Sequence, residues 1–191
     1  MAGLPDPSVE LSGDDLCCLP RDGGTTRRGC TRAGLCADVQ QPDVARLVGG
    51  LGGQLRYHGV LPGDVRDLVI LHVARRMGVA YEWVHRVRPA HAAGLGAEVL
   101  EALAAGRVPG ALRADQRPAL VAADAVFDLS SIPPEQQGTL AAAHGTAAVV
   151  ELAALVGLYR LLGGMVAACD IAIESDFAPF VPAWAQEGAP S

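Results

Sequence analysis

The sequence predicts an all-α fold, a helical bundle of about six to eight helices, and two observations lead to this prediction. Half of the 191 residues are hydrophobic, which is enough for a substantial core in one domain. Apolar residues recur at helical spacing in successive segments, and glycine or proline residues separate these segments. We therefore expect a helical domain over residues 39–175, an irregular extension over residues 1–38 and a C-terminal tail over residues 176–191.

The first half of the domain is expected to contain one helix followed by a helical hairpin. Apolar residues fall at helical spacing over residues 44–55, and the Leu61-Pro62-Gly63 segment ends that helix. Residues 66–77, RDLVILHVARRM, are too apolar for a surface helix, and Gly78 stops them. A second helix follows, and Pro89 ends or kinks it.

Three further helices are expected before the longest apolar run. A short one covers residues 97–105, just before a glycine. Asp115 can cap a longer helix that runs through Leu129. The Pro133-Pro134-Glu135 segment is a start signal for the third, which Gly145 stops.

The longest apolar run, residues 146–173, is expected to be a buried central helix. Its length alone would permit a membrane span. Arg160 in its middle, Glu151 near its start and the lack of a basic flank favour burial in the protein instead. A buried guanidinium requires a partner, and for Arg160 we expect a carboxylate of the protein, such as Asp124, or of a ligand. Helices that are apolar on all sides lie inside a bundle or an oligomer.

Charged side chains on the hairpin form the candidate functional site. Counting from Gly78, Asp67 lies eleven residues before the turn and Arg86 eight after it. An antiparallel hairpin that rises about 1.5 Å per residue therefore brings these two residues within about a turn of each other. Glu82 and His85 lie on the same second helix, so charges from both helices can meet over an apolar floor.

The hairpin residues also carry a family resemblance. RDLVILHVARRMG, followed by AYEW, a histidine and AGL, resembles the carboxymuconolactone decarboxylase and alkylhydroperoxidase-D-like superfamily. The similarity covers about residues 40–173 and continues weakly into LVAADAVFDL and VELAALVGLYRLL. It implies an alkylhydroperoxidase-D-like bundle, a homo-oligomer with active sites near subunit contacts, and cofactor-free chemistry of the decarboxylase type.

The sequence departs from the family pattern in three ways. Val79 and Glu82 stand where the peroxidase branch has a Cys-x-x-Cys pair, so peroxide reduction by a dithiol is excluded. The family's early glutamate is Asp67 here, one methylene shorter. The usual histidine four residues after Glu82 is Arg86, and a guanidinium cannot exchange a proton near neutral pH. His85 lies one position earlier and points about 100° further round the helix.

The resemblance implies a reaction class, and the residues suggest the roles. We expect decarboxylation, proton transfer with isomerisation, or cyclisation of a small carboxylated or enolisable metabolite, in specialised metabolism. Arg86 would hold an anionic group of the substrate, Glu82 or His85 would move the proton, and Asp67 would orient that donor. The expected substrate-binding residues are Tyr81, Trp83 and Arg160.

The rival interpretation is a non-catalytic relative, an oligomeric binding or scaffold protein with a closed site. In that case Glu82 and Arg86, spaced i,i+4, form only a helical ion pair, worth about 0.2 to 0.5 kcal/mol if it is exposed. His85 would then be an interfacial histidine with satisfied hydrogen bonds. The two interpretations differ in whether these three residues line an open cavity or pack against each other.

Composition limits the partners, cofactors and location. The net charge of −6 and the absence of a basic run argue against nucleic acid, and the absence of lysine excludes Schiff-base chemistry. The five cysteines show no metal-ligand spacing, so we expect no metal. Their odd number and a polar N-terminus without an apolar signal segment favour free thiols in the cytoplasm. The alternative is a zinc site or a thiol redox centre built from Cys17, Cys18, Cys30 and Cys36.

Overall fold

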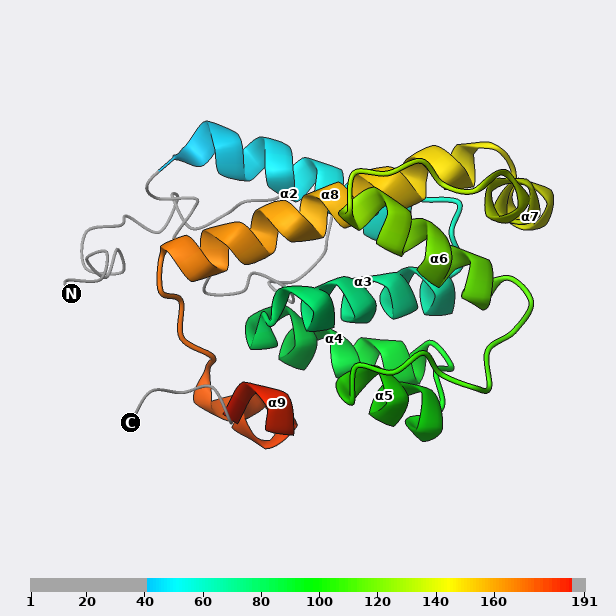
Figure 1. Ribbon diagram of the computed structural model, residues 1–191. Helices are drawn as coiled ribbons and strands as arrows, with labels where there is room; N and C mark the ends of the chain where they lie inside the picture. Colours follow the sequence, from blue (N-terminus) through cyan, green and yellow to red (C-terminus); the bar gives the residue numbers. More distant parts are fainter. Residues whose placement is uncertain (1–40, 187–191) are drawn as a thin grey trace.

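The computed structural model describes residues 41–186, and every regular element in this range is a helix (Figure 1). The prediction of an all-α bundle is confirmed. The elements in chain order are α2 (Pro42–Tyr57), α3 (Gly63–Met77), α4 (Ala80–Ala92), α5 (Ala97–Ala104), α6 (Gln116–Phe127), α7 (Pro134–His144), α8 (Ala147–Ala168), the 3-10 helix η2 (Ser175–Phe180) and α9 (Ala183–Gln186). The expected extension over residues 1–38, with four of the cysteines, lies outside the described residues.

The apolar helix α3 lies in the middle of the bundle, with α6 and α8 on one side and α4 and α5 on the other (Figure 1). One hydrophobic cluster joins α3 to α6, α7 and α8 and includes Val69 and Ile70. A second cluster joins α3 to α4 and α5 and includes Leu68 and Leu71. All four side chains are fully buried, which explains why the run is apolar on every side.

The hairpin of α3 and α4 forms as the sequence predicts. Gly78 ends α3 in the left-handed region, with φ at 68°, where a side chain would be strained. The amide of Val79 donates to the Ala74 carbonyl at 3.0 Å, so the last turn of α3 is closed by backbone hydrogen bonds. Pro89 lies inside α4, which continues to Ala92 before it ends.

Two polar contacts fix the N-terminal end of α3. The Glu151 carboxylate of α8 accepts hydrogen bonds from the backbone amides of Val60 at 2.6 Å and Leu61 at 3.0 Å. The buried Asp64 carboxylate accepts hydrogen bonds from Gln116 at 2.8 Å and from Arg113, next to the start of α6. Since these partners lie about fifty to ninety residues apart in the chain, they fix α3 against α6 and α8.

The helix α8 is buried on one side and exposed on the other. Leu152 and Val156 have no exposed surface, whereas the side chains of Val150 and Leu161 are 72% and 48% exposed. By length and composition alone, α8 is the one described helix that could cross a membrane, with 39% of its most apolar window buried. The core helix of a soluble protein meets the same criteria.

The C-terminal segment of the described chain packs against α4 instead of extending as a tail. Phe177 and Phe180 of η2 and Trp184 of α9 pack on the second hydrophobic cluster. The Trp184 and Trp83 rings meet edge to face, with centroids 6.1 Å apart. Residues 176–186, which we expected to be a tail, therefore cover α4.

Candidate functional site

The hairpin and α8 bring together four polar side chains that we call the buried charge cluster, defined as Asp67, Glu82, Arg86 and Tyr159. The Arg86 guanidinium lies 5.9 Å from the centre of the Tyr159 ring. Its positive charge lowers the pKa of Asp67, of Glu82 and of Tyr159 against the larger effect of burial, which raises all three. Three of the four residues lie on the hairpin, as the sequence predicts.

The Glu82 side chain is partly buried, and its carboxyl has no hydrogen-bond or ion-pair partner among residues 41–186. Burial raises its pKa from the usual 4.5 to about 7, although Arg86 and Arg56 oppose the shift. A carboxyl group with this pKa is present in both protonated and ionised forms near neutral pH, as a general acid or base requires.

The ion pair between Glu82 and Arg86, central to the rival interpretation, does not form. No nitrogen of Arg86 comes within 4.0 Å of a carboxylate oxygen in the described chain. Its Nε atom is buried and has no hydrogen-bond partner there, and the same holds for Oδ1 of Asp67. The nearest cation to Asp67 is Arg66, whose Nε lies 3.8 Å from that oxygen. Buried polar groups without partners are uncommon, and each needs an explanation.

His85 and Tyr81 face the C-terminal segment and contact Glu174, the residue before η2. The Nε2 atom of His85 lies 3.1 Å from one carboxylate oxygen, and the Tyr81 hydroxyl donates to the other at 3.1 Å. The His85 ring also lies 4.1 Å from the Phe177 ring and 4.5 Å from that of Tyr81. Burial lowers the pKa of His85, and Glu174 opposes this. Of the two proton carriers considered, His85 is bonded to Glu174 and Glu82 has no such partner, although the positive charge of Arg86 acts on both.

All three expected substrate-binding residues lie outside this cluster, and Tyr81 binds Glu174 instead. Trp83 is in the second hydrophobic cluster and packs on Trp184. The Arg160 Nη1 donates to the Phe127 carbonyl at 3.0 Å, and the guanidinium lies 4.8 Å from the Phe127 ring centre. Our expectation that Asp124 is the partner of Arg160 is wrong, because Arg160 donates to a backbone carbonyl of α6 while Asp124 pairs with His72 and Arg76.

Sequence reasoning missed two residues, Tyr159 and Glu174. Tyr159 precedes Arg160 on α8 and is 4% exposed. The signal for it in the sequence was a tyrosine within an apolar run, because a buried phenol usually needs a polar partner. Glu174 binds His85 and Tyr81, which lie about ninety residues earlier in the chain, and no local sequence pattern predicts these contacts. Between residues 41 and 186, no group of three or more metal-ligating side chains lies together.

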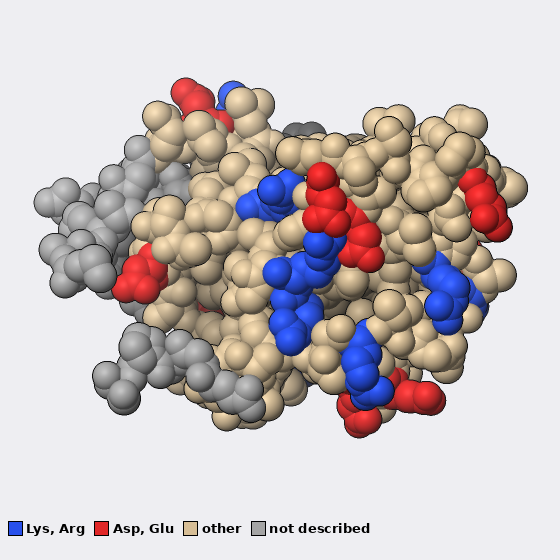
Figure 2. All heavy atoms as spheres, in the orientation of Figure 1, with Lys and Arg blue, Asp and Glu red and all other residues tan. Residues whose placement is uncertain are grey.

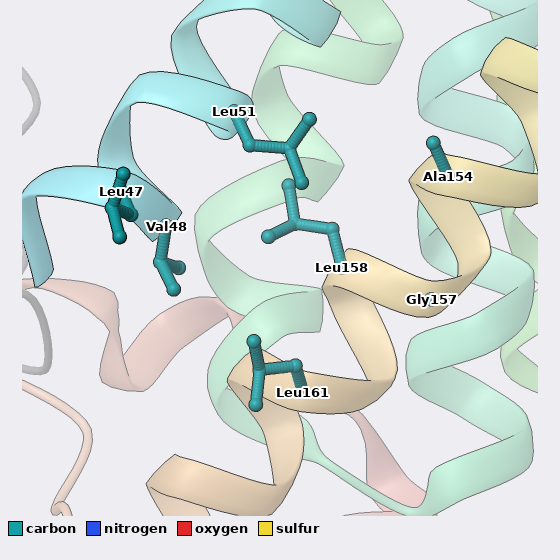
Figure 3. A pocket seen from close by; sticks show the side chains of 7 residues that line it. All are labelled: Leu47, Val48, Leu51, Ala154, Gly157, Leu158 and Leu161. Atoms are coloured by element: carbon teal, nitrogen blue, oxygen red, sulfur yellow. The ribbon is translucent and has the colours of Figure 1, made fainter. Parts of the chain in front are cut away.

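An apolar groove of about 400 Å³ lies between α2 and α8 (Figure 3). Leu47, Val48 and Leu51 of α2 face Leu158 and Leu161 of α8 across it. None of the groove residues belongs to the buried charge cluster. The expected core face of the first helix is thus partly open, since the Leu47 side chain is 63% exposed.

Comparisons of the chain with protein-family models, with curated proteins and with solved structures gave no match. The resemblance to the carboxymuconolactone decarboxylase superfamily therefore depends on the hairpin motif and stays a prediction.

Proposed function

We propose that this chain is a cofactor-free enzyme of the carboxymuconolactone decarboxylase type, which decarboxylates or isomerises a small carboxylated or enolisable metabolite. The observation that supports this most is the partly buried Glu82 carboxyl, which has a pKa of about 7 and no partner in the described chain. Arg86, with a buried and unpartnered Nε, supplies a positive charge next to it.

The chemistry assigns one task to each of these groups. In decarboxylation, the substrate carboxylate leaves as carbon dioxide, and its bonding electron pair passes into an adjacent carbonyl to form an enolate. The Arg86 guanidinium stabilises the enolate oxygen, and protonated Glu82 donates its proton to the carbon that lost the carboxylate. Glu82 then regains a proton from water. Isomerisation uses the same two groups, with Glu82 first accepting and then returning the proton.

Asp67 acts as a positioning residue in this proposal. Its charge lies close enough to Arg86 for the guanidinium to lower its pKa. Our sequence-based role for it, orienting the proton donor, therefore becomes an electrostatic one, in which its negative charge attracts the Arg86 guanidinium without a direct ion pair. The proposal assigns no proton-transfer role to His85, because its Nε2 atom is bonded to Glu174 and its ring packs on Phe177.

The test uses a carboxymuconolactone as the probe and follows its loss and the release of carbon dioxide. We expect Glu82→Gln and Arg86→Ala to lower the rate about 100-fold or more, and Arg86→Lys to recover little because the planar fork is lost. Arg88→Ala, on an exposed residue of the same helix, is the matched control and should keep the rate. Unchanged turnover in both Glu82→Gln and Arg86→Ala would contradict the proposal.

If the wild type does not act on this probe, the Arg86→His variant is tested for decarboxylation of the same compound. It restores the histidine that the family has at this position, so a gain of decarboxylation would support the family placement and assign a different substrate to the natural arginine. Absence of activity in the wild type and in Arg86→His would remove the decarboxylase assignment.

We also propose that the chain forms a homo-oligomer through the exposed face of α8. The support is the groove between α2 and α8 together with Val150 and Leu161, exposed apolar residues on the side of α8 that does not face the core. This proposal is independent of the chemistry at Glu82.

A further inference from the structure

A second hollow, of about 230 Å³, lies where α3 and α5 end, and we call it the arginine hollow. It is lined by His72, Arg75, Arg76, Leu103, Gly106, Arg107 and Val108. Figure 2 shows basic side chains gathered in the middle of one face, over the region where Figure 1 places α3 between α5 and α6. The chain as a whole has a net charge of −6, whereas the residues that line this hollow include three arginines and no acidic residue.

Arg75 is held in place without using the outer nitrogens of its guanidinium. Its Nε donates to the Ala104 carbonyl at 3.0 Å, and its Cζ lies 5.1 Å from the Trp184 ring centre. Nη1 and Nη2 have no acceptor in the described chain. Gly106, with φ at 69°, lies directly against this group, because a Cβ there would be 3.2 Å from Nη2. The guanidinium is therefore oriented while its outer donors stay available.

Arg107 is the second available cation, and Arg76 differs from both. The exposed Arg107 side chain makes no hydrogen bond or ion pair in the part of the chain that the structure describes. Arg76 instead binds Asp124 at 2.9 Å and Asp128 at 2.8 Å. In the hollow, the guanidinium groups of Arg75 and Arg107 therefore have N–H donors available for a ligand, whereas two carboxylates already neutralise that of Arg76.

The chemistry of the lining indicates the class of ligand. Two guanidinium groups offer parallel N–H donors, which match the oxygens of a phosphate in bidentate geometry. A phosphate monoester carries about −1.5 to −2 charge at pH 7, close to the two positive charges of Arg75 and Arg107, whereas a carboxylate carries only one. Leu103 and Val108 add an apolar wall that suits a short carbon chain.

We propose that the arginine hollow binds the phosphate group of a small phosphate monoester, at a site that shares no residue with the buried charge cluster. Arg75 and Arg107 would contact the phosphate oxygens, while Leu103 and Val108 would contact the carbon part. This goes beyond the proposed decarboxylase activity and does not depend on it.

The test is calorimetric titration of the full chain with butyl phosphate, in a phosphate-free buffer of low ionic strength, with butyrate as the probe of matched chain and lower charge. We expect saturable binding of butyl phosphate and binding of butyrate that is weaker by about tenfold or more. Arg75→Gln and Arg107→Gln should each weaken butyl phosphate binding by about tenfold or more. Arg46→Gln, on exposed α2, removes the same charge elsewhere and should not weaken it.

Three results would overturn the proposal: no saturable binding of butyl phosphate, equal affinity for butyrate, or an equal loss in Arg46→Gln. Because Arg75 also packs on Trp184, Arg75→Gln is checked by its circular dichroism and melting temperature. The exposed Arg107 has no packing role, so an unchanged affinity in Arg107→Gln would by itself contradict the two-arginine site.

Discussion

Replacing Glu82 by glutamine should stabilise the protein in alkaline solution and leave its stability in acid nearly unchanged. In the folded chain burial raises the pKa of this carboxyl to about 7, against 4.5 for an exposed glutamate. The unfolded chain therefore releases the Glu82 proton at lower pH than the folded chain does. Ionisation favours the unfolded state as the pH rises through this interval. Glutamine has nearly the same size and no such ionisation.

The magnitude follows from the size of the shift. A rise from 4.5 to about 7 corresponds to about 3 kcal/mol of free energy of unfolding, lost by the wild type once the pH exceeds both values. Below pH 4.5 both states hold the proton and the cost disappears. The carboxyl has no hydrogen bond in the described chain that glutamine would break. We therefore expect Glu82→Gln to be more stable by up to about 3 kcal/mol at pH 8 and by under about 0.5 kcal/mol at pH 4.5.

Urea unfolding followed by circular dichroism, for wild type and variant at both pH values, measures this difference. Other groups titrate equally in both proteins, so their contributions cancel when the two are subtracted at each pH. Glu101→Gln, on an exposed residue of α5, is the control and should change the free energy of unfolding by under about 0.5 kcal/mol at either pH. A stability difference for Glu82→Gln that stays constant between pH 4.5 and 8 would refute the raised pKa and remove Glu82 as a proton carrier.

Three further predictions address the rest of the molecule. Glu151→Ala leaves the two backbone amides before α3 without their acceptor and should lower the free energy of unfolding by about 1 to 3 kcal/mol in urea; a loss under about 0.5 kcal/mol would contradict this. The pKa of His85 is lowered from 6.5, so its imidazole should titrate below that value by nuclear magnetic resonance, and the stability it contributes should be lost as the pH falls below 6.5; a midpoint above 6.5 would be inconsistent with its burial. Size exclusion with light scattering should give more than one 19.7 kDa chain per particle, and Leu161→Glu should reduce it to one; a monomeric wild type would exclude the oligomer.

Two of the helix boundaries were predictable because the signals for them are local. Gly78 ends α3 since only glycine takes up a left-handed conformation without strain, and that requirement does not depend on the rest of the chain. Pro134 opens α7 for a similar reason, because its fixed φ suits the first turn. Pro89 was ambiguous, as a proline within a helical pattern can end a helix or lie inside it.

The side-chain pairing was not predictable from the same sequence. An i,i+4 spacing places Glu82 and Arg86 on one side of α4, but it does not choose between a mutual ion pair and two separate positions. Tyr159, whose ring centre lies 5.9 Å from the Arg86 guanidinium, comes from a helix far along the chain, and no local spacing predicts that contact. Glu174 binds His85 in the same non-local way.

The cost of the buried charge cluster connects fold and function. The partly exposed Glu82 carboxyl has no hydrogen-bond or ion-pair partner in the described chain, and Asp67 Oδ1 and Arg86 Nε are buried there without hydrogen bonds. Each such group destabilises a fold by about 1 to 3 kcal/mol, and an ion pair between Glu82 and Arg86 would relieve part of that cost. The α4 spacing allows the pair, yet the two side chains stay apart. A helical bundle with no use for these groups would be more stable with apolar residues at all three positions. Proton transfer to a bound anion requires a carboxyl group that can carry the proton and a cation that no carboxylate neutralises, and this is why the proposed chemistry is centred on Glu82 and Arg86.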